Sequence, residues 1–393
     1  MNVSETPLAG VRVLELSHMV MGPSAGLILA DLGATVIKVE PPGGDKTRKL
    51  RGSGAGFFPM YARNRQSICI DLKTDQGRET VRRLLGGVDA LIENFRSGAL
   101  AGLKLDYDSL RDDFPQLIYC SLKGFLSGPY AHRTALDEVT QMMGGLAYMT
   151  GPSGRPLRAG ASVIDVLGGT FGALGILAAL HERRRTGQGQ HLSSGLFEST
   201  AFLVGQHMAQ EAVTGEPAPP MPERAPAWAI YDVFQCADAL PLFVAVVSNA
   251  QWQAFCREFG RDDWLGDARL AENNDRVAAR GWLLDEVRAL FAGMTRTAAI
   301  ERIERIGLPF APIARPSELF EDEHLNSGGL VEVTLPDSDT KTRLPGLPLE
   351  IDGRRTRLRE DLAAPGAHSR RVLQEAGFAA EEIDELFASG SVT

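Results

Sequence analysis

Asp165 is the side chain whose setting in this sequence points most directly to chemistry. It opens a run of glycine, alanine and large apolar residues that stays uncharged up to residue 180. The apolar residues recur at helical spacing, so we predict a buried helix that ends near Arg185. Four glycines keep this helix thin, which suits the close approach of another backbone: Gly168, Gly169, Gly172 and Gly175.

Two interpretations of Asp165 fit the local pattern. A carboxylate at a helix start is favoured by unpaired backbone N–H groups and by the helix dipole, so Asp165 could be an N-cap. The alternative is a carboxylate that is held ionised in a cleft and used as a nucleophile. The surrounding residues do not decide between them.

A second group of candidate residues lies in a long loop rich in glycine and proline, residues 41–61. Loops of this length are often functional. The loop carries four cations that either face the phosphates of a ligand or form a solvated surface: Lys46, Arg48, Lys49 and Arg51.

The elements that must position these residues follow a β-α-β pattern. A strand at residues 11–16, a helix at 23–32 and a strand at 34–40 are typical of the start of a doubly wound parallel sheet. Ligands bind such sheets at the C-terminal ends of the strands. The unit lacks a G-x-G-x-x-G motif, which disfavours a dinucleotide site. Further strands are predicted at 67–72, 89–93, 117–122 and 191–196, and helices at 75–86, 137–147 and 197–211.

Composition then divides the chain. Residues 214–226 contain five prolines and are predicted to form a linker. Residues 227–327 read as a smaller α+β domain, with strands at 229–234 and 242–247 and helices near 252–259, 276–291 and 296–306. Residues 328–393 are expected to complete a large domain with residues 1–213, with helices at 369–377 and 380–388 packed back on it.

The overall composition excludes several protein classes. The 393 residues carry a net charge of −9, which argues against a general nucleic-acid binder. The four cysteines are scattered without metal-ligand spacing, and reduced thiols in a cytoplasmic protein explain them. The N-terminus has no signal-peptide pattern, and the apolar run at 166–180 is too short to span a bilayer. We therefore expect a soluble cytoplasmic protein without a membrane or nucleic-acid partner.

Several stretches, taken in order, resemble the class III CoA-transferases, a family that also includes α-methylacyl-CoA racemase. The resemblance covers nearly the whole chain. It implies an α/β fold with a Rossmann-like large domain and a smaller inserted α+β domain, in a homodimer of interlocked rings. It is carried by P-L-A-G-V-R-V-L-E-L from Pro7, L-G-A-T-V-I-K-V-E-P from Leu32, G-G-D-K-T-R from Gly43, S-I-C-I-D-L-K from Ser67, E-N-F-R-S-G from Glu93, G-I-L-A-A-L-H-E-R-R-R-T-G-Q-G-Q from Gly175 and I-G-L-P-F-A-P-I from Ile306.

The resemblance also implies a site. Asp165 matches the family's catalytic aspartate, which would relay CoA between carboxylic acids through a mixed anhydride and an enzyme thioester. Asp137 keeps an acid near it, as an orienting group or as a helix N-cap. Coenzyme A would be a substrate, with no tightly bound cofactor and no metal. The residues matching its binding segments are Met19, Val20, Met21, Ile70, Asp71, Leu72, Lys73, Asn94, Phe95, Arg96, Thr134, Ala135 and Leu136.

Departures from the family pattern narrow the activity. A racemase needs a base where this chain has Leu136, so transfer is favoured over racemisation. An α-methylacyl-CoA racemase or isomerase, and a non-catalytic CoA-binding protein, remain as alternatives. The family's nucleotide-contacting arginine falls on Gly102, where Lys104 could substitute.

The acceptor acid is the least constrained feature. Residues that mark oxalate specificity are replaced by Val20, Leu50 and Phe57, so we expect an acceptor other than oxalate. Cations near the mouth suit a dicarboxylate of four to six carbons, with succinyl-CoA as one donor: Arg48, Arg51, Arg63 and Arg65.

Overall fold

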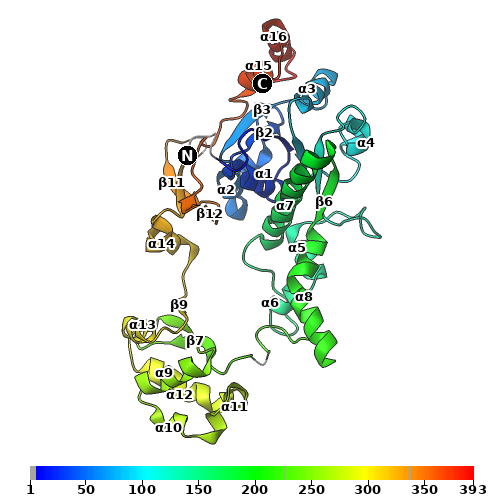
Figure 1. Ribbon diagram of the computed structural model, residues 1–393. Helices are drawn as coiled ribbons and strands as arrows, with labels where there is room; N and C mark the ends of the chain where they lie inside the picture. The colour runs from blue at the N-terminus through cyan, green and yellow to red at the C-terminus, as the bar shows by residue number, and fades with distance from the viewer. Residues whose placement is uncertain (1–5, 225, 336–337) are drawn as a thin grey trace. The chain divides into compact units, whose positions relative to one another are not determined.

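The computed structural model describes residues 6–224, 226–335 and 338–393 (Figure 1). Residues 1–5 of the predicted large domain, residue 225 of the predicted linker, and residues 336–337 lie outside the described part. The chain divides into two compact units, one of residues 1–223 and 323–393 and the other of residues 224–322.

A parallel sheet of six strands organises the first unit, in the order β3-β2-β1-β4-β5-β6. This confirms the predicted α/β class. The strands are β1 (Arg12–Leu16), β2 (Thr35–Glu40), β3 (Arg65–Cys69), β4 (Ala90–Glu93), β5 (Ile118–Lys123) and β6 (His191–Gly195). The helices between them are α1 (Met21–Asp31), α2 (Phe57–Tyr61), α3 (Asp75–Leu85), α4 (Tyr107–Leu110), α5 (Asp137–Met143), α6 (Leu146–Thr150) and α7 (Val163–Thr186), and α8 (Leu196–Thr214) follows the last strand.

Helices cover both faces of the sheet, and apolar side chains of its strands are buried on both faces. Val13 of β1 packs with helices α1 and α7, whereas the next residue, Leu14, packs with α3 on the opposite face. The helices α15 (Ser369–Glu375) and α16 (Ala380–Ala388) join that second face through Val372 and Ile383. The end of the chain also pairs beside β3, where Ile70 bridges Val392.

The first unit also includes a short helix and two hairpins between residues 323 and 355. The helix α14 (Glu323–Asn326) leads into an antiparallel hairpin of β10 (Leu330–Thr334) and β11 (Lys341–Pro345) and a shorter one of β12 (Glu350–Ile351) and β13 (Arg354–Arg355).

The second unit is an antiparallel sheet packed with helices around its own aromatic core. Its strands are β7 (Tyr231–Gln235), β8 (Pro241–Ala245) and β9 (Phe310–Pro312), and its helices are α9 (Asn249–Glu258), α10 (Asp262–Leu265), α11 (Asn273–Ala278), α12 (Arg280–Ala292) and α13 (Arg296–Arg305).

Three local predictions need correction. The helix predicted at 137–147 is two helices, because Gly145 adopts a positive φ of 85° between them. The helix predicted at 276–291 is likewise divided into α11 and α12. Among the described residues one helix, α7, is long and apolar enough to cross a membrane by length and composition, because the helix extends beyond the apolar run at 166–180. Core helices of soluble proteins pass the same test, and α7 packs on the sheet.

Candidate active site

The strand order changes direction between β1 and β4, so the candidate ligand crevice is the region between the loops that follow these two strands. The chain continues from β1 to β2 on one side and from β4 to β5 on the other, and open α/β sheets bind ligands at such a switch point. The two loops are tied together here. The side-chain Nδ2 of Asn94 donates to the His18 carbonyl at 2.8 Å, and its Oδ1 accepts from the His18 N–H at 3.0 Å.

The predicted acyl-pocket residues take different places at this crevice. Met19 is exposed and adopts a φ of 65°, a left-handed conformation that non-glycine residues seldom adopt. Val20 and Met21 are buried at the start of α1. The loop therefore presents Met19 outward and anchors its next two residues in the core.

Glycines bring α7 against α1. A Cβ added to Gly169 would lie 2.0 Å from the Ser24 Oγ and 2.5 Å from the Met21 carbonyl oxygen, and one added to Gly168 would lie 2.6 Å from the Met21 side chain. Only glycine permits this approach. Asp165 lies one helical turn before Gly169, so it is on the face of α7 that packs on α1.

Asp137 binds the backbone at the start of α7, although it lies in another helix and far away in the sequence. Its Oδ2 accepts from the backbone N–H groups of Ile164 at 2.8 Å and Asp165 at 3.1 Å, and its Oδ1 accepts from the Gln141 amide. Gln141 in turn accepts from the Ala159 N–H at 2.8 Å. The buried Asp137 therefore fixes both the helix start and the segment before it.

This geometry corrects both N-cap interpretations. Asp165 is the third residue of α7, and the N-cap, Ser162, makes no side-chain capping bond. Asp137 is the first residue of α5, after the N-cap Leu136, and its carboxylate binds the start of α7 and the side chain of Gln141.

The electrostatics of Asp165 also differ from the expectation of a carboxylate held ionised. Burial and then the charge of Asp137 raise the pKa of Asp165 to about 7, and Arg158 opposes the shift. Burial and the charge of Asp165 raise the pKa of Tyr61, which shows that this phenol lies within electrostatic reach. The arrangement provides a half-buried carboxylate that is easily converted between its acid and its nucleophilic form near neutral pH.

The family model for CoA-transferase family III matches residues 8–369. The chain belongs to this family and is a CoA-transferase. It is 36% identical to the succinate–glutarate CoA-transferase of Agrobacterium fabrum, over 94% of this chain and 95% of that protein. It is 32% identical to the acetyl-CoA:oxalate CoA-transferase of Acetobacter aceti, over 92% and 97%. A crystal structure of a CaiB/BaiF family protein from Brucella suis has a TM-score of 0.82 and 32% identity, over 94% of this chain and 99% of that one.

The residues of the CoA-transferase predicted to contact CoA after β3 are only partly accessible. Ile70 is buried in its bridge to Val392, Asp71 and Leu72 are half-buried, and Lys73 is exposed. After β4, Asn94 and Phe95 are half-buried, Arg96 is exposed, and the Phe95 ring lies 5.7 Å from the His18 ring.

The third predicted segment lies beside the loop after β5. Ala135 packs there so closely that a Cβ on Gly124 would lie 2.4 Å from its own. Thr134 and Leu136 are exposed. Gly102 and Lys104 are both exposed as well, and a Cβ on Gly102 would meet open space.

Most of the cations expected at the mouth are structural. Arg63 pairs with Asp31 at 2.7 Å and is 1% exposed, and Arg65 pairs with Glu15 at 3.1 Å and is 2% exposed. Arg48 pairs with Glu40 at 2.6 Å. These three arginines neutralise buried carboxylates, so the prediction that they face a dicarboxylate substrate is wrong. Arg51, Lys46 and Lys49 are exposed.

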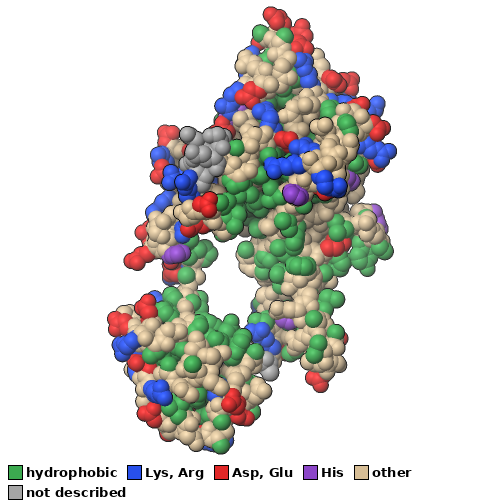
Figure 2. Space-filling view, viewed as in Figure 1, with side chains coloured by type: hydrophobic (Ala, Val, Ile, Leu, Met, Phe, Trp, Pro, Cys, Tyr) green, Lys and Arg blue, Asp and Glu red, His purple; other side chains and the backbone are tan. Residues whose placement is uncertain are grey.

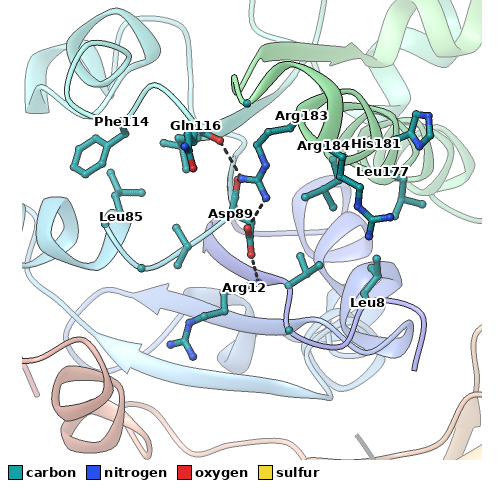
Figure 3. A pocket seen from close by; sticks show the side chains of 18 of the residues that line it. Leu8, Arg12, Leu85, Asp89, Phe114, Gln116, Leu177, His181, Arg183 and Arg184 are labelled. Atoms are coloured by element: carbon teal, nitrogen blue, oxygen red, sulfur yellow. Dashed lines mark hydrogen bonds and ion pairs between the residues drawn. The ribbon is translucent and has the colours of Figure 1, made fainter. Parts of the chain in front are cut away.

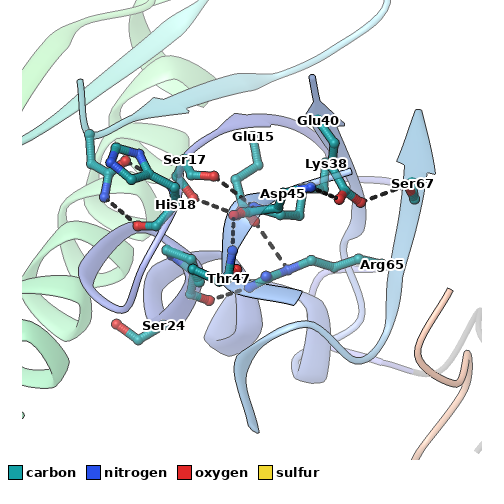
Figure 4. Close-up of polar contacts among 12 residues, drawn as sticks. Glu15, Ser17, His18, Ser24, Lys38, Glu40, Asp45, Thr47, Arg65 and Ser67 are labelled. Atoms are coloured by element: carbon teal, nitrogen blue, oxygen red, sulfur yellow. Dashed lines mark hydrogen bonds and ion pairs between the residues drawn. The ribbon is translucent and has the colours of Figure 1, made fainter. Parts of the chain in front are cut away.

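The same cluster contains a residue that sequence reasoning missed. Buried Lys38 donates to the Ser17 carbonyl at 2.7 Å while it pairs with Asp45 at 3.1 Å and Glu15 at 3.4 Å (Figure 4). It thus fixes the start of the loop after β1. Its place between the apolar residues Ile37 and Val39 was the available signal.

A large cavity of about 900 Å³ lies at the N-terminal ends of the strands, opposite the candidate site (Figure 3). Asp89, at its centre, accepts from the backbone N–H of Arg12 at 2.8 Å and pairs with Arg183. The predicted site residues do not line it.

Proposed function

We propose that this enzyme moves CoA from an acyl-CoA thioester to a small dicarboxylate, with succinyl-CoA as the first donor to test. The names of the two relatives support a dicarboxylate, because glutarate and oxalate are both diacids. The sequence departures at Val20, Leu50 and Phe57 favour an acceptor longer than oxalate. The observation that carries the proposal is Asp165, a half-buried carboxylate at the start of a glycine-packed helix, with its pKa raised to about 7.

The chemistry is a covalent relay through Asp165. Its ionised carboxylate attacks the thioester carbonyl, the C–S bond breaks, and a mixed anhydride and CoA thiolate form. The thiolate attacks the aspartyl carbonyl and expels the donor acid, leaving an aspartyl-CoA thioester. The acceptor carboxylate attacks that thioester and releases the thiolate, which then attacks the acceptor's carbonyl to give the new acyl-CoA and free Asp165.

Other residues have supporting roles in this proposal. Asp137 orients Asp165 through the backbone of the first turn of α7. Exposed Lys73 and Arg96 supply positive charge for the CoA phosphates, with Lys104 as a further cation. The segments named above contribute Met19–Met21, Ile70–Leu72, Asn94–Phe95 and Thr134–Leu136 to the CoA and acyl contacts.

Trapping tests the relay directly. Incubation with succinyl-CoA and then hydroxylamine or borohydride should modify the wild-type enzyme at Asp165, as mass spectrometry of the peptide would show. Asp165→Asn should give no adduct and no transfer. An unmodified Asp165 in an enzyme that still transfers CoA would refute the relay. Exchange of α-hydrogen with deuterated water in the absence of an acceptor would instead support the racemase alternative.

We also propose that the enzyme is a homodimer. Helices α7 and α8 of the first unit expose Leu174, Phe202, Met208 and Val213, which are 57%, 74%, 64% and 87% accessible. Hydrophobic side chains gather over the helices α5 to α8 in Figure 2. Large apolar side chains that are exposed together are typical of an interface. The four cysteines are free and buried, which suits a reducing compartment such as the cytoplasm.

A further inference from the structure

A buried carboxylate and a half-buried ammonium group bind the two backbone polar groups of Phe95. Glu93, the last residue of β4, accepts from the Phe95 N–H at 2.9 Å. Lys123, the last residue of β5, donates to the Phe95 carbonyl at 3.0 Å and lies 2.6 Å from Glu93. The Glu93 side chain is 2% exposed and that of Lys123 is 24% exposed. The loop after β4 is therefore held at one residue by an ion pair behind it.

The position of the pair follows from the sheet. Strands β4 and β5 are parallel neighbours, so their last residues meet at the edge where the crevice lies. Burying two charges costs desolvation energy that an apolar pair would not cost, so stability alone is a weak reason for this pair. Its hydrogen bonds instead fix the conformation of a loop that is otherwise partly exposed.

The constraint extends to the loop after β1. Asn94, next to Phe95, makes the paired bonds to the backbone of His18, and Lys38 holds the carbonyl of Ser17. The next residue is Met19, in its left-handed conformation. A series of side-chain to backbone bonds thus runs from Lys123 across the crevice to the predicted acyl pocket.

We propose that Glu93 and Lys123 are positioning residues for CoA. They keep Phe95, and through Asn94 the loop after β1, in the conformation that receives the CoA portion of donor and product. A loop that is already ordered loses little conformational entropy on binding, so the pair acts on affinity. The inference rests on the proposed function, because it assumes that the loop of Asn94, Phe95 and Arg96 contacts CoA.

The experiment compares removal of the Glu93–Lys123 ion pair with removal of an ion pair elsewhere in the first unit. Lys123→Met alone leaves Glu93 as a buried unpaired charge and risks misfolding, so the main variant is Glu93→Gln/Lys123→Met, which removes both charges. The control is Glu332→Gln/Lys341→Met, which removes an ion pair of 2.8 Å in the β10–β11 hairpin. Calorimetric titration with free CoA gives Kd, and initial rates give kcat and the KM of each substrate.

The main variant should raise the Kd of CoA and the KM of the acyl-CoA by roughly tenfold, because the Phe95 carbonyl loses its charged partner. The kcat and the KM of the acceptor acid should stay at wild-type values, and the control should match wild type throughout. Amide hydrogen exchange in residues 94–99 should become faster in the main variant without ligand. If the main variant does not fold, Glu93→Gln alone supplies the same measurements with a smaller expected change.

Phe95→Ala distinguishes a failure of the proposed CoA site from a failure of the positioning role of Glu93 and Lys123. If it leaves CoA binding unchanged, the proposed CoA site is wrong. If it weakens binding while the folded main variant binds CoA and exchanges amides like wild type, the site stands and the positioning role of Glu93 and Lys123 is overturned.

Discussion

At the scale of single residues, Asp165 must be ionised to attack, yet its surroundings favour the protonated form. Burial and Asp137 raise its pKa to about 7. We therefore expect kcat/KM for the acyl-CoA to rise with pH, by about tenfold per unit below pH 7, and to level off above it. Asp137→Asn removes the neighbouring negative charge and should move this limb to lower pH. A rate independent of pH between 5.5 and 8 would contradict the assignment.

A measurement of unfolding free energy against pH checks that the rise of kcat/KM with pH reports the ionisation of Asp165. Its pKa is higher in the folded state than the ordinary 3.8, so the folded state holds the proton more tightly. Below pH 3.8 both states are protonated; as pH rises to 7 only the unfolded state ionises, and stability falls. Asp165→Asn should therefore be more stable than wild type by an amount that grows up to pH 7, to about 2–4 kcal/mol. A pH-independent difference in unfolding free energy would assign the limb to another group.

At the scale of elements, the contact between α1 and α7 decides where Asp165 lies. The Cβ of alanine at position 169 would lie 2.5 Å from the backbone oxygen of Met21, so Gly169→Ala must push the helices apart. We expect a loss of about 1–3 kcal/mol in unfolding free energy and a lower kcat, because Asp165 moves with its helix. Gly281→Ala in α12 is the control, since no atom of the described residues outside its own helix backbone and chain neighbours lies within 4 Å of the added Cβ. It should be neutral or stabilising, and equal effects would contradict the close-contact argument.

Elements were predictable where one local pattern determined them. The alternation of residues 11–16 indicated β1 within six residues, although the polar Glu15 of that strand is buried in the fold. The glycines of α7 indicated close packing before the partner, α1, was known. The start of α7 was predicted within a few residues for the same reason.

Contacts between distant residues were not predictable from local pattern. Asp137 caps a helix that begins 26 residues later, and only the fold brings its carboxylate there. Arg63 and Arg65 looked like surface cations because charged residues are seldom buried. Their partners Asp31 and Glu15 lie in other elements, so no spacing in the sequence reveals the pairs. The candidate site was therefore predicted from the family resemblance, whereas the charge environment of Asp165 came from the structure.

At the scale of the whole molecule, the exposed apolar residues on α7 and α8 favour burial against a partner. The proposed partner is a second copy, and the family resemblance implies that the two rings interlock. Threaded rings separate only if a chain opens, whereas subunits joined by surface contact alone exchange at equilibrium. Tagged and untagged dimers mixed under native conditions should therefore form no mixed dimer, and should form it only after unfolding and refolding. Native mass spectrometry distinguishes the species.

The same experiment separates dimerisation from interlocking. A monomer at micromolar concentration would refute the dimer itself. A dimer that exchanges subunits within minutes would keep the interface and refute the threading. Phe202→Glu/Met208→Glu places two charges on the exposed apolar face of α8, where the wild-type side chains are 74% and 64% accessible. If that face is covered in the dimer, burying these charges without partners costs several kcal/mol, and refolding should then yield monomer or aggregate. Unchanged dimer formation would place the interface elsewhere.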